Sequence, residues 1–333
     1  MRHDQGIRSN RRLMYIPPAR RAKVEIAMYF SITNFVTKTV SKFFIIILPL
    51  CLVCMPPADA QTKKQLRPEH ANADVSRAGV KDASFHSAAL NRDMRYRIIL
   101  PAGYAESARR FPTLYLLHGL YGDYENWETR TNLDLYVEKL GWIIVMPDAA
   151  NSWYTNSATV PGDKFEDYIT HDLIDEIDAR YRTIRSRHSR AIAGLSMGGY
   201  GAIKFALNNP DSFTFVGSLS GALNAPLDLG DTTPAFREGL EKVFGPPGDL
   251  ARSRNDIFTL LNSSDPARLP YLYIECGSSD SLLQTNRAFA AKLATRKVAY
   301  ESHESPGEHS WEFWDAALCR MLHALERVSK SKG

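Results

Sequence analysis

The sequence predicts an α/β fold with a mostly parallel central sheet and helices on both faces. Short apolar runs alternate along the chain with longer segments of helical periodicity, and this alternation is typical of strands joined by helical crossovers. Several apolar runs are continuous, for example residues 113–118, as expected for strands buried on both faces. One long helix is indicated by apolar residues at four-residue steps: Phe165, Ile169, Leu173, Ile177 and Tyr181.

The remaining elements follow in order along the chain. Strands are expected at 94–100, 113–118, 142–147, 190–195, 213–220, 271–276 and 297–303, and further helices at 283–293 and 311–328. Residues 222–262 are less regular and predict an insertion beside the sheet. Residues 61–84 are polar with little periodicity and predict a linker. The sequence therefore predicts one domain over residues 85–328.

The positive charge of the chain is concentrated near its N-terminus. The formal net charge is +4, from 41 Lys/Arg and 37 Asp/Glu. Residues 1–60 contain nine of the basic and three of the acidic residues, which leaves 32 basic and 34 acidic residues in the rest of the chain. Because the body has no basic excess, no nucleic-acid partner is expected.

The N-terminal segment, residues 1–60, has the features of a leader and a signal peptide. Two lysines precede an apolar run at 43–55, which is short for a membrane span. Residues 58–60 then fit the small-x-small pattern of a cleavage site. We expect cleavage near Ala60, export to the periplasm or the extracellular space, and no stable membrane insertion afterwards; a retained anchor is the alternative. Translation can begin at Met1 or at Met28.

Cleavage would leave two of the four cysteines, Cys276 and Cys319. Cys276 lies in an apolar strand pattern, and two cysteines make no disulfide framework, so two buried thiols are expected. Their spacing does not suit a metal site. Neither a metal nor an organic cofactor is predicted.

A G-x-S-x-G element centred on Ser196 stands between a strand pattern and a helical pattern. A serine at a sharp strand-to-helix turn adopts strained backbone geometry, and the flanking Gly194 and Gly198 would remove steric collisions and leave its Oγ exposed. The N–H of Met197, at the helix N-terminus, would then point to where an oxyanion forms. The alternative is an ordinary glycine-rich turn, but the strand and helix context favours a nucleophile.

A nucleophilic serine needs a histidine as base and a carboxylate to orient that histidine, in the chain order serine, acid, histidine. His303, His309 and His323 follow Ser196. His323 lies in the final helical pattern and His303 ends a strand pattern. His309 lies in a Gly-containing loop that can bring its imidazole to the carboxyl edge of the sheet. His309 is therefore the expected base.

Asp280 is the expected acid, because it follows the strand at 271–276 and so lies at the same edge as the serine. Its alternative role is to cap the helix that follows, since aspartate is a favoured N-cap. Glu275 lies along the strand and is less well placed, and Asp211 and Asp231 come too early in the strand order.

The loop after an early strand is expected to supply a second oxyanion donor. His118-Gly119 allows a tight turn there, so that the N–H of Leu120 can face the site, and His118 itself is expected to make structural hydrogen bonds. Trp153 and Tyr154 follow a later strand. They would either line the alcohol side of a substrate pocket or pack their own loop.

Four segments together resemble the putative-esterase family of α/β-hydrolases, which includes S-formylglutathione hydrolases, feruloyl and acetyl-xylan esterases, tributyrin-type esterases and mycolyltransferases. The segments are YLLHGLYGDYENW, AGLSMGGYGAI, CGSSDSLL and GEHSWEFW. The resemblance covers about residues 85–325. It implies an α/β-hydrolase fold. It also implies functional roles for a nucleophile, an acid, a base and two oxyanion donors: Ser196, Asp280, His309, Leu120 and Met197.

The family resemblance and the export signal together predict a secreted carboxylesterase for short acyl or aryl esters, with carbohydrate-linked esters among the candidates. One alternative is an acyltransferase that uses the same triad with a sugar acceptor. Another is a non-enzymatic binding protein on a hydrolase fold. A broken triad would be typical of such a protein, whereas every member is present here.

Overall fold

The computed structural model describes residues 79–227 and 232–331, which belong to one compact unit, Asn72–Gly333. The expected signal peptide and leader at 1–60 lie outside these residues, as does most of the expected linker. The prediction of a linker up to residue 84 was wrong at its end, because strand β1 begins at Val80. β1 is an edge strand with mostly exposed or half-buried side chains, so its sequence carries little apolar alternation.

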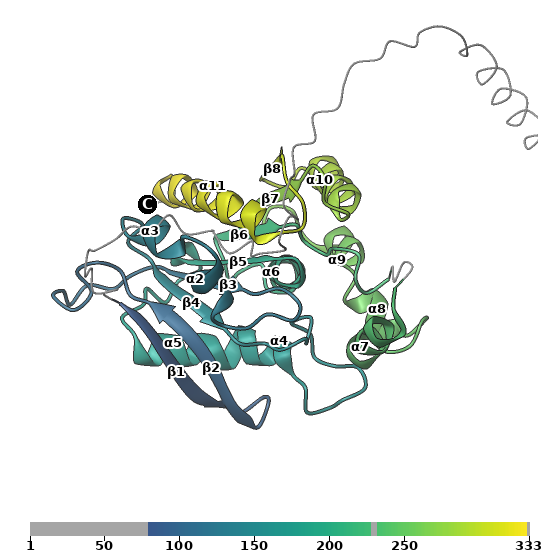
Figure 1. Ribbon diagram of the computed structural model, residues 1–333, viewed down its shortest axis with the longest axis horizontal. Coiled ribbons are helices and arrows are strands. Elements are labelled where there is room, and N and C mark those ends of the chain that lie inside the picture. The colour runs from purple at the N-terminus through teal and green to yellow at the C-terminus, as the bar shows by residue number, and fades with distance from the viewer. Residues whose placement is uncertain (1–78, 228–231, 332–333) are drawn as a thin grey trace, which may run out of the picture. The chain divides into compact units, whose positions relative to one another are not determined.

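An eight-stranded sheet forms the centre of the fold, in the order β1-β2-β4-β3-β5-β6-β7-β8 (Figure 1). The strands are β1 Val80–Ser87, β2 Arg92–Ile99, β3 Thr113–Leu117, β4 Ile143–Pro147, β5 Arg190–Leu195, β6 Phe215–Leu219, β7 Tyr271–Gly277 and β8 Tyr300–Ser305. The pairs β1–β2 and β2–β4 are antiparallel, and all other pairs are parallel. The predicted mostly parallel sheet is confirmed.

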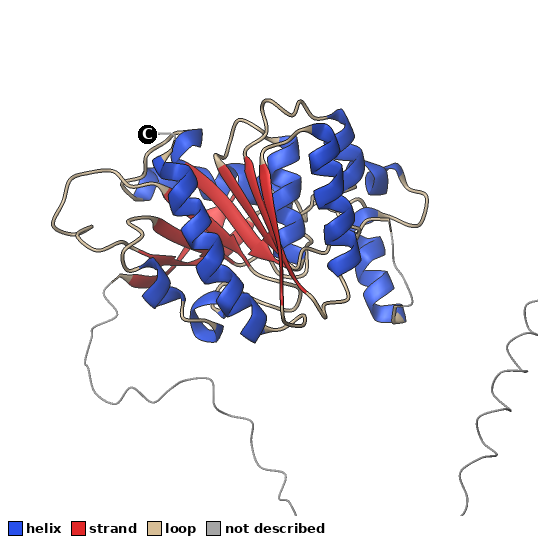
Figure 2. Cartoon of the chain, turned by 90° about the horizontal axis from the view of Figure 1, so that it is seen from above, coloured by secondary structure: helices blue, strands red, loops and turns tan. Residues whose placement is uncertain are grey.

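Helices cover both faces of the sheet (Figure 2). In β3, Leu114 and Leu116 belong to one hydrophobic core and Tyr115 and Leu117 to the other, because successive side chains of a strand point to opposite faces. The first core is shared with α2 (Asn126–Arg130), α3 (Leu133–Val137) and α11 (Trp311–Lys330). The second is shared with α6 (Met197–Asn208), α10 (Leu283–Arg296) and the helical run that starts at Phe165.

The long helix predicted over 165–181 contains a π-helical segment. Its parts are α4 (Phe165–Asp167), the π-helical η2 (Tyr168–Leu173) and α5 (Ile174–Arg180). In an α-helix with 3.6 residues per turn, residues four apart are rotated by about 40° relative to one another, so a stripe at strict four-residue steps winds slowly around the helix. The wider turns of η2 offset this drift. The apolar stripe therefore stays buried as far as Ile177.

Three short helices occupy the region predicted as an insertion: α7 (Pro234–Phe244), α8 (Leu250–Arg254) and α9 (Ile257–Ser263). α9 packs beside α6 (Figure 1). Within the described ranges, none of the helices combines the length and apolar character that a membrane span requires. Cys276 and Cys319 are both free thiols; Cys276 is buried, as predicted, whereas Cys319 is only half-buried.

Candidate active site

Ser196 occupies the turn between β5 and α6 in a backbone conformation that non-glycine residues rarely adopt. Its φ is 52° and its ψ is −116°. Three backbone hydrogen bonds hold this residue: the Ser196 N–H donates to Leu219 O at 2.9 Å, and Ser196 O accepts the N–H groups of Tyr200 at 3.0 Å and Ala222 at 3.1 Å. Strained residues of this kind persist only where the surrounding structure fixes them, and they concentrate at functional sites.

The glycines on either side of Ser196 provide the clearance that the sequence predicts. A Cβ on Gly194 would lie 2.5 Å from the carbonyl carbon of Gly198. A Cβ on Gly198 would lie 2.5 Å from the carbonyl oxygen of Leu117, the last residue of β3. The turn therefore closes tightly on itself and presses against the end of the neighbouring strand.

The structure brings Ser196, His309 and Asp280 together in one line of hydrogen bonds. His309 Nε2 lies 3.0 Å from Ser196 Oγ, and His309 Nδ1 lies 2.8 Å from Asp280 Oδ2. The three residues follow β5, β8 and β7, respectively, so they meet at the carboxyl edge of the sheet, where open α/β sheets bind their ligands. The alternatives His303 and His323 lie elsewhere: His303 is on β8, 3.2 Å from Glu301, and His323 is within α11.

Of the two roles that the sequence left as alternatives, Asp280 meets the base and does not cap α10, whose N-cap residue is Leu282 with no side-chain capping hydrogen bond. Its side chain has no exposed area. One carboxylate oxygen faces His309, and the other accepts the Leu282 N–H at 2.9 Å, directly before α10. Burial alone would raise the pKa of Asp280, but the hydrogen bonds from His309 and Leu282 outweigh it, so this pKa lies below its ordinary value. The carboxylate is therefore ionised beside the imidazole.

Glu275 is a second buried carboxylate, but it takes no part in this line. Its oxygens accept hydrogen bonds from Tyr273 at 2.5 Å, Ser305 at 2.8 Å and Arg320 Nε at 2.9 Å. The expectation that it is badly placed to be the acid is confirmed.

The loop after β3 runs directly beside Ser196, where the sequence places a second oxyanion donor. A Cβ on Gly119 would lie 3.6 Å from Ser196 Cβ. The Gly122 N–H donates to Gly119 O at 3.1 Å and closes a turn around Leu120. Among the described residues no backbone acceptor pairs with the Leu120 N–H. Met197 is the first residue of α6, where N–H groups have no acceptor within the helix.

His118 has the structural role that the sequence predicts. It is buried, its Nδ1 lies 2.7 Å from Gly119 O, and its Nε2 accepts the Ala149 N–H at 3.0 Å. These bonds require the neutral tautomer with the proton on Nδ1. Burial lowers the pKa of His118, so the ring is neutral. The Ala149 N–H occupies the lone pair of Nε2, so this nitrogen is not free to accept a proton from substrate.

Trp153 and Tyr154 pack the loop after β4. Tyr154 is fully buried, and its hydroxyl donates to the His118 carbonyl at 2.9 Å. Trp153 is 5% exposed and lies against the rings of Tyr200 and Phe244. Of the two alternatives, the structure favours packing over a substrate-lining role.

Lys204 is a buried charged residue on the helix that follows Ser196, and the sequence pattern does not single it out. It lies on α6 with no exposed area, and its Nζ donates to Thr155 Oγ1 and Glu166 Oε2, both at 2.8 Å. Burial lowers the pKa of Lys204, and the nearby Glu166 opposes this shift. These bonds fasten α6 to the loop after β4 through Thr155 and to α4 through Glu166. The only sequence signal was a lysine inside an otherwise apolar helical pattern.

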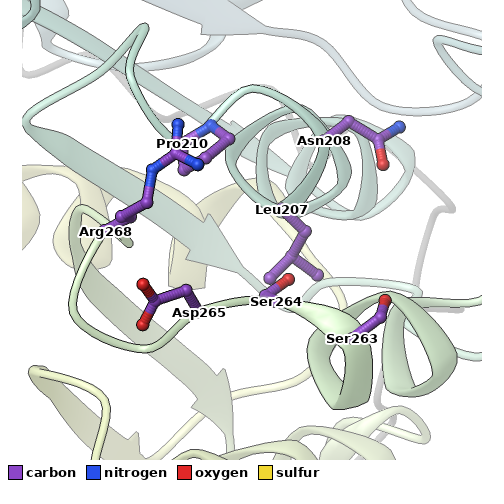
Figure 3. A pocket seen from close by; sticks show the side chains of 7 residues that line it. All are labelled: Leu207, Asn208, Pro210, Ser263, Ser264, Asp265 and Arg268. Carbon is purple, nitrogen blue, oxygen red and sulfur yellow. The ribbon is translucent and has the colours of Figure 1, made fainter.

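A cavity of about 290 Å³ lies at the opposite edge of the sheet (Figure 3). Pro210 precedes β6 and Arg268 precedes β7, so the cavity faces the amino ends of the strands. It is lined by Leu207, Asn208, Pro210, Ser263, Ser264, Asp265 and Arg268. It shares no residue with the serine site. Within the described residues, no cluster of His, Cys, Asp or Glu is arranged to hold a metal ion.

The fold and the hydrogen-bonded line of serine, histidine and aspartate define the class of α/β-hydrolases. The chain belongs to the putative-esterase family, because the model of that family matches residues 87–325. It is accordingly an enzyme, a serine hydrolase that acts on carboxylic ester bonds. The predicted family and enzyme class are confirmed.

The chain is similar to individual relatives over most of its length. The acetyl esterase of Caldicellulosiruptor saccharolyticus is 25% identical over 265 residues, which cover 75% of this chain and 99% of the relative. The diacylglycerol acyltransferase/mycolyltransferase Ag85B of Mycobacterium intracellulare is 26% identical over 275 residues, or 72% of this chain and 80% of the relative. The fluorophosphonate-binding serine hydrolase FphF of Staphylococcus aureus has a solved structure similar to this one, with a TM-score of 0.67. The two sequences are 28% identical, and the match covers 74% of this chain and 98% of FphF.

Proposed function

We propose that this chain is an exported serine carboxylesterase in which Ser196 is the nucleophile, His309 the general base and Asp280 the residue that orients the base. The observation that carries the proposal is the line of hydrogen bonds from Ser196 Oγ through both nitrogens of His309 to Asp280, with distances of 3.0 and 2.8 Å. A serine hydroxyl with a base in reach, itself oriented by a carboxylate, is the arrangement that activates this weak nucleophile.

Acylation begins when Ser196 Oγ attacks the ester carbonyl and His309 Nε2 accepts its proton. The developing oxyanion receives hydrogen bonds from the N–H groups of Leu120 and Met197. Asp280 stabilises the imidazolium that forms. His309 then protonates the leaving alcohol as the tetrahedral intermediate collapses to the acyl-enzyme.

Deacylation repeats these steps with water in place of the serine. His309 accepts a proton from water as water attacks the acyl carbonyl, the same two N–H groups stabilise the second oxyanion, and the proton returns to Ser196 Oγ as the acid is released. None of these steps requires a redox cofactor.

We propose short acyl or aryl esters as substrates, including carbohydrate-linked ones. The similarity to an acetyl esterase supports a short acyl group. The side chain of His309 is 35% exposed while that of Asp280 is fully buried, so the base is reached from solvent and a bulky alcohol can approach it. Export rests on the apolar run at 43–55 and the small-residue pattern at 58–60.

Acyl transfer to a sugar hydroxyl is the second candidate, because the chain is also similar to a mycolyltransferase. The acyl-enzyme is common to both reactions, and only the acceptor differs. Product analysis with an added polyol separates them: transfer gives a new ester, whereas hydrolysis gives the free acid alone.

The test compares Ser196→Ala with Ser218→Ala, a buried serine on β6 whose hydroxyl has no hydrogen-bond partner within the described residues. Turnover is measured on nitrophenyl esters of increasing chain length, methyl ferulate and acetylated xylan. Ser196→Ala should lower kcat by on the order of 10³- to 10⁶-fold and abolish labelling by a fluorophosphonate, and Ser218→Ala should preserve both. Near-normal turnover in Ser196→Ala would overturn the assignment, and absence of turnover and labelling in the wild type would favour a binding protein.

A further inference from the structure

Three tryptophans form a chain of perpendicular rings that ends on His309. The imidazole of His309 packs against Trp314 with ring centroids 4.8 Å apart and planes at 87°. Trp314 meets Trp311 at 5.2 Å and 89°, and Trp311 meets Trp127 at 5.7 Å and 88°. Edge-to-face contacts at these separations are favourable for aromatic rings. The base is therefore in contact with an ordered aromatic stack.

The far end of this stack is tied to the strand that leads into the oxyanion loop. Trp127 is 1% exposed, and its Nε1–H donates to the carbonyl of Leu117 at 3.0 Å. Leu117 is the last residue of β3 and directly precedes His118 and Gly119. The three indoles thus connect the loop of the base with the loop of the proposed oxyanion donor.

The start of α11, which carries Trp311 and Trp314, is fixed independently. Asp315 accepts the backbone N–H and the side-chain Nδ2–H of Asn132, both at 2.8 Å, and also accepts the Tyr136 hydroxyl at 3.1 Å. These bonds hold the helix start against α3, so Trp314 has a fixed position relative to the sheet.

Trp314 acts on its surroundings by packing. It is 6% exposed, and its indole nitrogen has no hydrogen-bond partner among the described residues. The imidazole reorients by rotation about its Cα–Cβ and Cβ–Cγ bonds, and such rotation would lengthen its hydrogen bonds to Ser196 and Asp280. A perpendicular indole at 4.8 Å restricts this rotation sterically.

We propose that Trp314 is a positioning residue that keeps the imidazole of His309 aligned between Ser196 and Asp280, and that Trp311 supports Trp314 through their ring contact. This inference rests on the proposed role of His309 as the base. Misplacement of a reacting group by about 1 Å can cost on the order of 100-fold in rate, so removal of this support should be visible in kcat.

The test compares Trp314→Leu and Trp314→Phe with Trp142→Leu. Trp142 is a matched control because it is 5% exposed in the same hydrophobic core and precedes β4. Trp314→Leu should lower kcat roughly 10- to 100-fold with KM nearly unchanged. Trp314→Phe should restore most of kcat, because it keeps an aromatic ring and removes no hydrogen bond. Trp142→Leu should lower the melting temperature with kcat near that of the wild type.

The outcomes separate this inference from the proposed function. Loss of activity in Ser196→Ala together with wild-type kcat in Trp314→Leu would overturn the role of Trp314 alone. Equal losses of kcat in Trp314→Leu and Trp142→Leu, or a rise in KM alone, would also overturn it. Full activity in Ser196→Ala would overturn both. If Trp314→Leu does not fold, Trp311→Leu tests the proposal instead, because Trp311 is the half-buried neighbour of Trp314. Its kcat should fall several-fold, and an unchanged kcat would contradict the proposal.

Discussion

Two carboxylates near the end of β7 are alike in burial and in the direction of their pKa shift, but they have different partners. The side chains of Glu275 and Asp280 both have no exposed area. In both, burial by itself would raise the pKa, and donated hydrogen bonds outweigh it, so that both pKa values lie below the ordinary ones. Glu275 faces the guanidinium of Arg320 on α11, whereas Asp280 faces the imidazole of His309.

The partner decides what each carboxylate can do. An arginine stays protonated under all physiological conditions, so the Glu275–Arg320 pair carries fixed charges that tie β7 to α11. An imidazole has one nitrogen that can accept a proton and one that can donate, so in the proposed mechanism Asp280 faces a group whose charge changes during the reaction. Burial and a lowered pKa are common to both carboxylates, so the separate roles that we propose for them follow from their partners alone.

Of the substitutions that test this difference between the two carboxylates, Asp280→Asn should have the largest effect on kcat. The amide can keep its oxygen on the Leu282 N–H and would then present its NH₂ group to His309 Nδ1, which forces the imidazole proton onto Nε2. A ring with a proton on Nε2 cannot accept one from Ser196. We expect kcat to fall by about 10³- to 10⁴-fold while the circular dichroism spectrum stays that of the wild type. A folded Asp280→Asn enzyme within tenfold of wild-type kcat would remove Asp280 from the mechanism.

Glu275→Gln should have the opposite profile, with a loss of stability and little loss of rate. The neutral amide keeps the shape of the side chain but weakens the hydrogen bonds from Arg320. Hydrogen bonds to charged groups contribute about 1.5–3 kcal/mol each. Because Arg320 is 44% exposed and water can replace part of this interaction, we expect a loss of about 1–3 kcal/mol in the free energy of unfolding, measured in urea. A fall in kcat as large as that of Asp280→Asn would show that the two carboxylates do not have separate roles.

The elements that the sequence predicted best are those whose pattern depends on burial alone. The strand at 190–195 was predicted with its observed bounds, Arg190–Leu195, because a continuous apolar run between turn signals fits a strand covered on both faces. β1 was missed because an edge strand buries few side chains and so shows little pattern. The π-helical segment η2 was missed because a four-residue step fits an ordinary helix nearly as well.

The site was predictable where motif and chain order constrain it. The glycines around Ser196 and the order serine, acid, histidine were sufficient to select the three residues that meet in space. The surrounding contacts were not predictable. The contact between His309 and Trp314 and the ion pair between Lys204 and Glu166 join residues on different elements, and their geometry depends on tertiary packing that no local pattern records.

The smallest predicted effect is on the pH dependence of stability: the free energies of unfolding of the wild type and Glu275→Gln should approach each other in acid. In the folded state the pKa of Glu275 lies below its ordinary value of 4.5, so the unfolded chain binds this proton more readily and the carboxylate stabilises the fold above that pH. The contribution is lost as pH falls through the folded-state pKa, where Glu275 becomes neutral like the glutamine that replaces it. Urea unfolding of the wild type and Glu275→Gln should therefore give a constant difference in free energy above about pH 5.5 and a shrinking one as the pH falls below 4.5. A difference that widens on acidification would mean that the pair with Arg320 does not stabilise the charged form, and that Glu275 and Asp280 do not share the lowered pKa on which their comparison depends.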